Sequence, residues 1–76
     1  MKALVEVITK ALVDHPEEVV ITEKNEGKAI VIEVKVAESD MGKVIGRQGR
    51  VAKSIRTVMK SVAGKEHKKI AIEFLD

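Results

Sequence analysis

The segment Ala29–Ala37 places the strongest constraint on the fold, because apolar and polar side chains alternate along it. Alternation with a period of two is typical of a strand that buries one face and exposes the other. Such a strand needs a second layer to cover its apolar face. That face is formed by Ile30, Ile32, Val34 and Val36.

Helical patterns supply the covering layer. Lys2–Asp14 has apolar residues at helical spacing and ends before Pro16, because the residue that precedes proline disfavours helix. Ser39-Asp40 resembles an N-cap for a short helix through Ile45. A longer helix is expected from about Arg50 to Ala63, with Gly64 as its C-terminal stop.

Two further strands complete the prediction. Val19–Thr22 is β-branched and is followed by turn residues at 24–27, and Lys69–Leu75 alternates again. The expected order is α-β-β-α-α-β in a single domain over residues 1–76. This predicts an α+β fold, a two-layer sandwich with a three-stranded sheet and three helices on one face. Phe74, the one aromatic residue, is expected in the core.

The charge is unevenly distributed, although the formal net charge is only +2. Residues 42–69 hold nine Lys and Arg against Glu66 alone, whereas residues 1–41 hold nine Asp and Glu against five Lys. Clustered positive charge is typical of a protein that binds a polyanion. On a helical wheel Arg50, Lys53, Arg56 and Lys60 fall within an arc of roughly 120°, opposite Val51, Ile55, Val58, Met59 and Val62.

The stretch MGKVIGRQGRVAKSIR (residues 41–56) contains three of the five glycines, with no acidic residue among them. Gly46 and Gly49 can adopt positive φ, and the following helix offers free N–H groups at its N-terminus. Together with nearby cations, this loop predicts a grip on phosphodiester oxygens. The alternative is a tight corner in which glycine serves only the turn. Neither a mononucleotide loop nor a dinucleotide fingerprint fits the spacing.

The run from Val44 to Ile55, VIGRQGRVAKSI, resembles the signature of the KH domain, V-I-G-x-x-G-x-x-[apolar]-x-x-I. The element order resembles the type II, or prokaryotic, KH arrangement over the whole chain. The length and the VIGRQGR…IRT run are similar to the small single-KH bacterial proteins of the KhpA (YlqC) type.

The resemblance implies an RNA-binding protein with a chaperone-like or post-transcriptional regulatory role and low sequence specificity. The loop of a KH domain clamps about four single-stranded nucleotides, and an apolar groove beside it receives the bases. Carried over, Gly46, Arg47, Gln48 and Gly49 would hold phosphates. Lys43, Arg50 and Lys53 would add charge, and Val44, Ile45 and Val51 would border the groove.

The resemblance also implies partners. Proteins of this type pair with themselves or with a second KH-containing protein (KhpB, also called Jag). The wide apolar arc near Val58 and Met59 predicts either a dimer face or simple core. Single-stranded DNA stays open as a ligand beside RNA, because a phosphate grip does not sense the 2′-OH. A KH-fold scaffold that binds proteins with little RNA contact is the alternative function.

Other chemistry finds little support in the sequence. The chain has no cysteine, which excludes thiolate metal sites and cysteine nucleophiles. His15 and His67 are expected to be isolated surface residues, and Ser39 a cap, so we expect no enzyme, no cofactor and no metal. The N-terminal stretch lacks signal-peptide features and no segment is apolar enough to span a membrane, which predicts a cytosolic protein without membrane contact.

Overall fold

The computed structural model describes residues 1–75 and contains one three-stranded sheet. The strand order is β1-β2-β3, so β3 forms one edge of the sheet. β1 runs antiparallel to β2, whereas β3 runs parallel to it, with Ile32 opposite Ile72. The strands are β1 (Val20–Glu26), β2 (Ala29–Lys35) and β3 (Lys69–Leu75).

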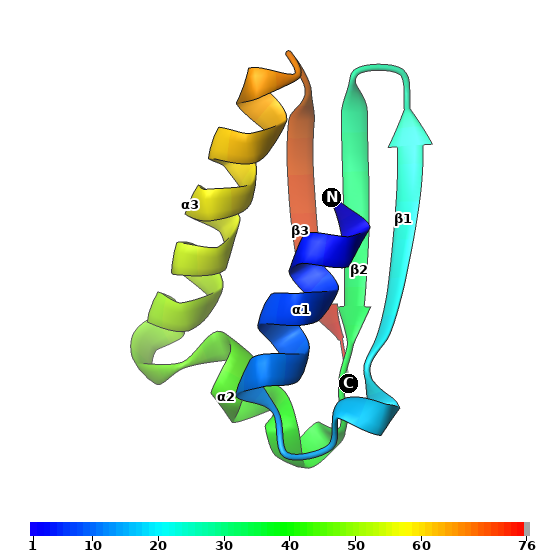
Figure 1. Ribbon diagram of the computed structural model, residues 1–76. Coiled ribbons are helices and arrows are strands. Elements are labelled where there is room, and N and C mark those ends of the chain that lie inside the picture. The colour runs from blue at the N-terminus through cyan, green and yellow to red at the C-terminus, as the bar shows by residue number, and fades with distance from the viewer. Residues whose placement is uncertain (76) are drawn as a thin grey trace.

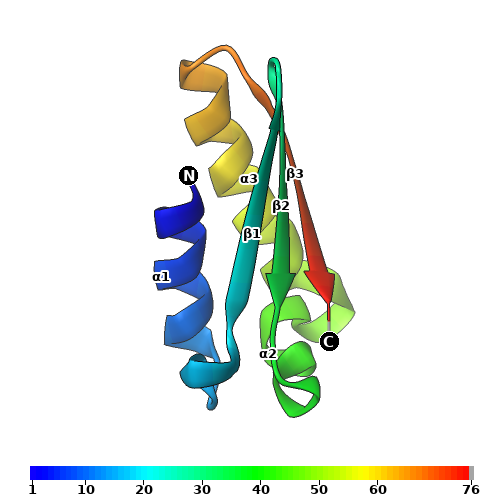
Figure 2. The same cartoon turned by 90° about the vertical axis from the view of Figure 1, so that its right-hand side faces the viewer.

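Three helices lie on one side of this sheet, as the view along its edge makes clear (Figure 2). The expected order and the two-layer α+β sandwich are thereby confirmed. Within residues 1–75, no helix combines the length and the apolar character that crossing a membrane requires. The helices are α1 (Lys2–Leu12), α2 (Met41–Ile45) and α3 (Arg50–Lys65).

The core lies between the two layers and follows the predicted alternation. All four residues of the predicted apolar face are buried, three of them in β2 and Val36 just after it. Met59 of α3 and Val5 of α1 pack against this core without any exposed surface. Phe74 is only half-buried and packs at the margin of this core, where the guanidinium of Arg56 lies 5.5 Å from its ring centre. The single aromatic residue therefore belongs partly to the core and partly to the surface.

The first hairpin corrects the expected boundaries. β1 extends to Glu26 instead of ending at Thr22, and the turn is confined to Gly27 and Lys28. The polar residues of β1 fit a strand because β1 is an edge strand, whose outer face stays in water. The Lys24 ammonium lies 3.2 Å from the Glu33 carboxylate on the neighbouring strand.

The C-terminus of α3 also differs from the prediction. The helix continues through Gly64 to Lys65, so Gly64 is not its stop. The residue in the left-handed conformation is His67, with φ of 59°. Its N–H donates to the Gly64 carbonyl at 3.1 Å, and the Lys68 N–H donates to the Ala63 carbonyl at 2.9 Å. These two bonds form a Schellman motif built on histidine in place of glycine.

Asp40 has a different role from the cap that the sequence predicts. Short 3₁₀ turns precede α2 (Glu38–Asp40) and follow α1 (Pro16–Glu18), and no side chain caps the start of α2. The carboxylate of Asp40 is buried and accepts the backbone N–H groups of Asp14 and His15 at 3.1 and 3.0 Å. It therefore ties the end of α1 to the start of α2.

Candidate nucleic-acid interface

The loop between α2 and α3 is a single 3₁₀ turn (Arg47–Gly49) held between two glycines. Gly46 ends α2 with φ of 77°, and its N–H donates to the Gly42 carbonyl at 2.9 Å. Gln48 and Gly49 follow with φ of 58° and 73°. Three residues of four thus have positive φ, and the chain turns the corner from α2 into α3 here (Figure 1).

The two glycines are required for different reasons. A Cβ on Gly46 would lie 2.8 Å from the Cβ of Val51 and 2.9 Å from its backbone nitrogen, closer than atoms pack. A Cβ on Gly49 would meet no atom within 4 Å, so positive φ is the only constraint there. Gly46 closes the corner against α3, whereas Gly49 faces open space.

The amides of the turn are available to a ligand. The N–H groups of Arg47 and Gln48 donate to no carbonyl in the part of the chain that the structure describes. Both residues are exposed, and α3 begins directly after them. Backbone N–H groups at the start of a helix favour an anion, because the helix dipole adds to their own. The Gln48 side chain accepts from the Arg50 guanidinium at 3.2 Å, which orders the turn.

Cations surround this turn without local neutralisation. Arg47, Arg50 and Lys53 are exposed, and none of the ion pairs found within residues 1–75 involves them. Like charges without acidic partners raise the local potential and attract anions. The structure thus brings together amides and guanidinium groups as the sequence predicts.

Lys43 is an exception among the predicted cations. Its ammonium lies 2.7 Å from the Asp14 carboxylate and 3.7 Å from that of Asp40. The hydrogen bond and the charge of Asp14, followed by Asp40, raise the pKa of Lys43 above its usual value. Asp14 lies far away in the sequence, so inspection of residues 41–64 alone could not reveal this neutralisation.

The three apolar residues assigned to a groove separate in the structure. Val44 has no exposed surface and packs in the core, so it supports the loop from behind and does not border a groove. Ile45 and Val51 are half-buried beside the loop. Only these two offer apolar surface to a ligand there.

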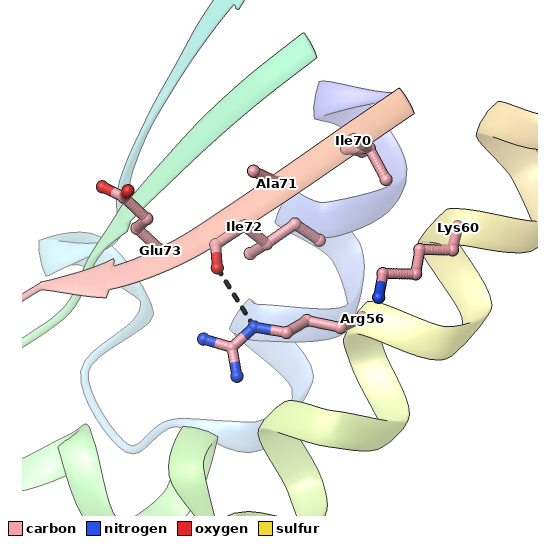
Figure 3. A pocket seen from close by; sticks show the side chains of 6 residues that line it. All are labelled: Arg56, Lys60, Ile70, Ala71, Ile72 and Glu73. Carbon is pink, nitrogen blue, oxygen red and sulfur yellow. Dashed lines mark hydrogen bonds between the residues drawn. The ribbon is translucent and has the colours of Figure 1, made fainter. Parts of the chain in front are cut away.

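A groove that the sequence did not reveal lies between α3 and β3. Its volume is about 350 Å³, and Arg56 and Lys60 form one wall while the edge strand forms the other (Figure 3). The Arg56 side chain donates through Nε to the Ile72 carbonyl at 3.1 Å. The helical wheel indicates the basic residues, but the edge position of β3 follows only from the strand order. Residues 70–73 complete the lining.

One cluster elsewhere corrects the view of His15 as isolated. Possible ligand atoms of His15, Glu17 and Glu18 lie within 4.8 Å of one another, and the imidazole Nδ1 is 3.4 Å from a Glu17 oxygen. All three residues are exposed and adjacent in sequence. Exposed groups of this kind are common on protein surfaces, so this cluster is not assigned to a metal.

Comparison with known proteins connects this geometry to a family. The family described as KhpA/KhpB, KH domain, matches residues 2–74. The chain belongs to this family. It is 55% identical to the RNA-binding protein KhpA of Clostridium perfringens over 75 residues, which cover 99% of this chain and 100% of the relative. The relative named RNA-binding protein KhpA from Halalkalibacterium halodurans is 46% identical over 76 residues, covering both chains completely. No solved structure matches this chain significantly.

The run that resembles the KH signature coincides with the turn described above. Gly46 and Gly49 are the two glycines of this run, and the preceding Val44-Ile45 places one side chain in the core and one beside the loop. The relatives carry the name of a binding protein and not of an enzyme.

Proposed function

We propose that this chain binds single-stranded RNA with low sequence specificity and grips the phosphate backbone with the turn Gly46–Gly49. The observation that carries the proposal is the pair of amides at Arg47 and Gln48, which donate to no carbonyl within residues 1–75, beside cations that form no ion pair in that range. The names of the relatives support RNA as the polyanion. A chaperone or regulatory role in the cytoplasm is the form of this activity that we expect.

The site residues divide into two groups under this proposal. In the turn Gly46–Gly49, the N–H groups of Arg47 and Gln48 hold phosphate, because those of Gly46 and Gly49 already donate to the Gly42 and Gly46 carbonyls. The two glycines give the turn its conformation, and Arg50 and Lys53 add charge. Bases then enter the groove between α3 and β3, where apolar surface lies beside Arg56 and the strand edge. The chain lacks stacked aromatics, so selectivity between bases should be modest. The same grip would accept single-stranded DNA, so both ligands belong in the test.

The decisive experiment compares wild type with Arg47→Asp/Gln48→Asp in binding a fluorescent single-stranded RNA library across a salt series. We expect salt-sensitive binding by wild type and none by the variant, because the added carboxylates repel phosphate. The double variant Lys24→Asp/Asn25→Asp replaces a cation and an amide with the same total change of charge at exposed positions of β1 and is expected to bind. Equal RNA binding by all three proteins would mean that the glycines serve only the turn between the helices. It would favour the alternative function, a scaffold that binds proteins.

We also propose that the chain pairs with a second KH domain, in the simplest case a second copy of itself. Val58 is not core, since 49% of it is exposed, and Val7 on α1 is 67% exposed. Both helices lie on the same side of the sheet (Figure 1). Exposed apolar residues on that side support a protein contact there. The family description names KhpA and KhpB together, which makes a KhpB (Jag) type partner the alternative.

Sedimentation tests this pairing directly. Wild type should sediment as a dimer at tens of micromolar concentration, and Val58→Asp should sediment as a monomer, because burying an unpaired carboxylate is unfavourable. Lys65→Asp adds a carboxylate to the same helix at another exposed position and serves as the control. A wild-type monomer at these concentrations would rule out the homodimer.

A further inference from the structure

A second hollow adjoins the groove between α3 and β3. It also measures about 350 Å³ and is lined by Lys60, Lys68, Lys69 and Ile70. Lys60 and Ile70 line both hollows, so the two form one continuous depression along the seam between the helix and the edge strand. Figure 3 shows how the Lys60 side chain extends from α3 toward this strand.

The lining of the second hollow is exclusively cationic apart from one isoleucine. Lys60, Lys68 and Lys69 take part in none of the ion pairs found among residues 1–75, and no carboxylate lines the hollow. Three lysines that line one hollow raise the positive potential there, and a bound anion is attracted to it. The first groove differs, because Glu73 contributes to its rim.

The backbone beneath these lysines is fixed on both sides. The Lys68 N–H is bound to the Ala63 carbonyl in the Schellman motif, and the Lys69 N–H donates to the Lys28 carbonyl at 2.8 Å. The motif depends on the left-handed conformation of His67, which a residue other than glycine adopts at some cost. Lys68 and Lys69 are therefore placed by the fold, and the Lys68 side chain is half-buried.

The glycine loop precedes the start of α3, whereas Lys68 and Lys69 follow its end, so the second hollow lies toward the opposite end of α3 from the loop. α3 has 16 residues and is about 24 Å long, and Lys60, the first residue that lines the hollow, lies about 15 Å of helix beyond Arg50. The depression between α3 and β3 occupies the space between the loop and the hollow, with Arg56 and Lys60 along it. A strand that leaves the loop and follows this seam passes Arg56 and Lys60 before it reaches Lys68 and Lys69, with Glu73 as the one acidic residue of the lining.

We propose that the RNA path continues past the few nucleotides held at the loop and ends at a second phosphate site formed by Lys60, Lys68 and Lys69. The inference rests on the proposed function of the loop and extends it, because it assigns a longer binding footprint than a loop clamp alone requires. An acidic peptide along the free edge of β3 would use the same cations. RNA is favoured because the lysines continue a seam that starts at the phosphate-gripping turn.

The test measures affinity as a function of oligonucleotide length. Single-stranded RNAs of about four to about ten nucleotides are titrated against wild type and Lys68→Gln/Lys69→Gln. Wild type should bind the longer RNAs several-fold more tightly than the shortest one. The variant should match wild type on the shortest RNA and lose the gain with length. On the longest RNA its salt slope should be shallower by about 1.4, since each phosphate contact to a single strand contributes about 0.7.

Controls separate this inference from the proposed function. Lys2→Gln/Lys10→Gln removes the same charge from α1, away from the seam, and should keep the length dependence of wild type. Equal length dependence in wild type and Lys68→Gln/Lys69→Gln, or no gain with length in wild type, overturns the second site. Undiminished binding of every length by Arg47→Asp/Gln48→Asp overturns the loop grip instead.

Discussion

The two sides of the glycine loop differ in how they are held. On the α2 side, Lys43 is paired with two carboxylates and Gly46 is packed against Val51. On the α3 side, Gly49 faces open space and Lys53 is exposed without an ion pair among residues 1–75. The α2 side therefore anchors the loop to the fold, whereas the α3 side is accessible to a ligand. Positive residues near a motif are therefore not equivalent.

Alanine substitutions at the two glycines should give the largest difference in stability between the two sides of the loop. Gly46→Ala adds a methyl group that overlaps Val51 in addition to the strain of positive φ, so we expect a loss of about 3 kcal/mol in unfolding free energy. Gly49→Ala meets only the strain and should cost about 1 kcal/mol. Thermal unfolding followed by circular dichroism should show midpoints lowered by about 15 °C and about 5 °C.

A second-site variant checks the cause of this difference. Val51→Ala in the Gly46→Ala background removes Cγ2, the nearest of the Val51 atoms that the new methyl group meets, and leaves Cβ and the backbone nitrogen in place, so only part of the lost stability should return. Equal costs for the two glycine variants would contradict the distinction between an anchored and an open side.

Asp40 holds the anchored side, and its effect should depend on pH. Burial alone would raise the pKa of Asp40, but the N–H groups of Asp14 and His15 and the charges of His15 and Lys43 lower it below its ordinary value of 3.8. A lowered pKa in the folded state means that the carboxylate stabilises the fold above pH 3.8. This stabilisation is lost as the pH falls through the lower, folded-state pKa.

The measurement is the urea midpoint of wild type and Asp40→Asn at neutral pH and at about pH 3. Asp40→Asn should be less stable at neutral pH, because its amide cannot accept both N–H groups as a carboxylate does. The gap between the two proteins should narrow in acid, where Asp40 itself becomes protonated. The other carboxylates are common to both proteins and cancel in the comparison. A difference in urea midpoint that stays constant with pH would show that ionisation of Asp40 does not stabilise the fold.

Local patterns in the sequence were sufficient for the layers and the loop. The alternation of β2 and the helical spacing of α3 depend on near neighbours, so both were predicted correctly, as was the extent of β3. The left-handed residue after α3 was misplaced, because Gly64 has the more usual side chain for that position while the fold uses His67. Propensity describes an average, and the hydrogen bonds of the Schellman motif decide the individual case.

The errors at the candidate site have one physical origin. The neutralisation of Lys43 by Asp14, the burial of Val44 and the groove beside β3 all depend on contacts between distant segments. Val58 shows the same limit, since its place on the apolar arc was compatible with either core or a dimer face, and only the fold shows that it is half exposed. A helical wheel gives direction around one helix, but the neighbouring elements decide what each direction meets.

The smallest effect is expected on the salt dependence of RNA binding when a single cation is removed from either side of the loop. Lys53→Gln removes a free cation, so the salt slope of RNA binding should become shallower by about 0.7, as for one lost phosphate contact. Lys43→Gln removes a cation that Asp14 and Asp40 already neutralise, so its slope should stay close to that of wild type. Fluorescence polarisation across a salt series measures both slopes.

Asp14→Asn provides the converse, because it removes the nearer partner of Lys43 and should strengthen RNA binding. If Lys43→Gln weakens binding as much as Lys53→Gln does, RNA must displace the carboxylates from Lys43, and the anchored side would then be part of the interface.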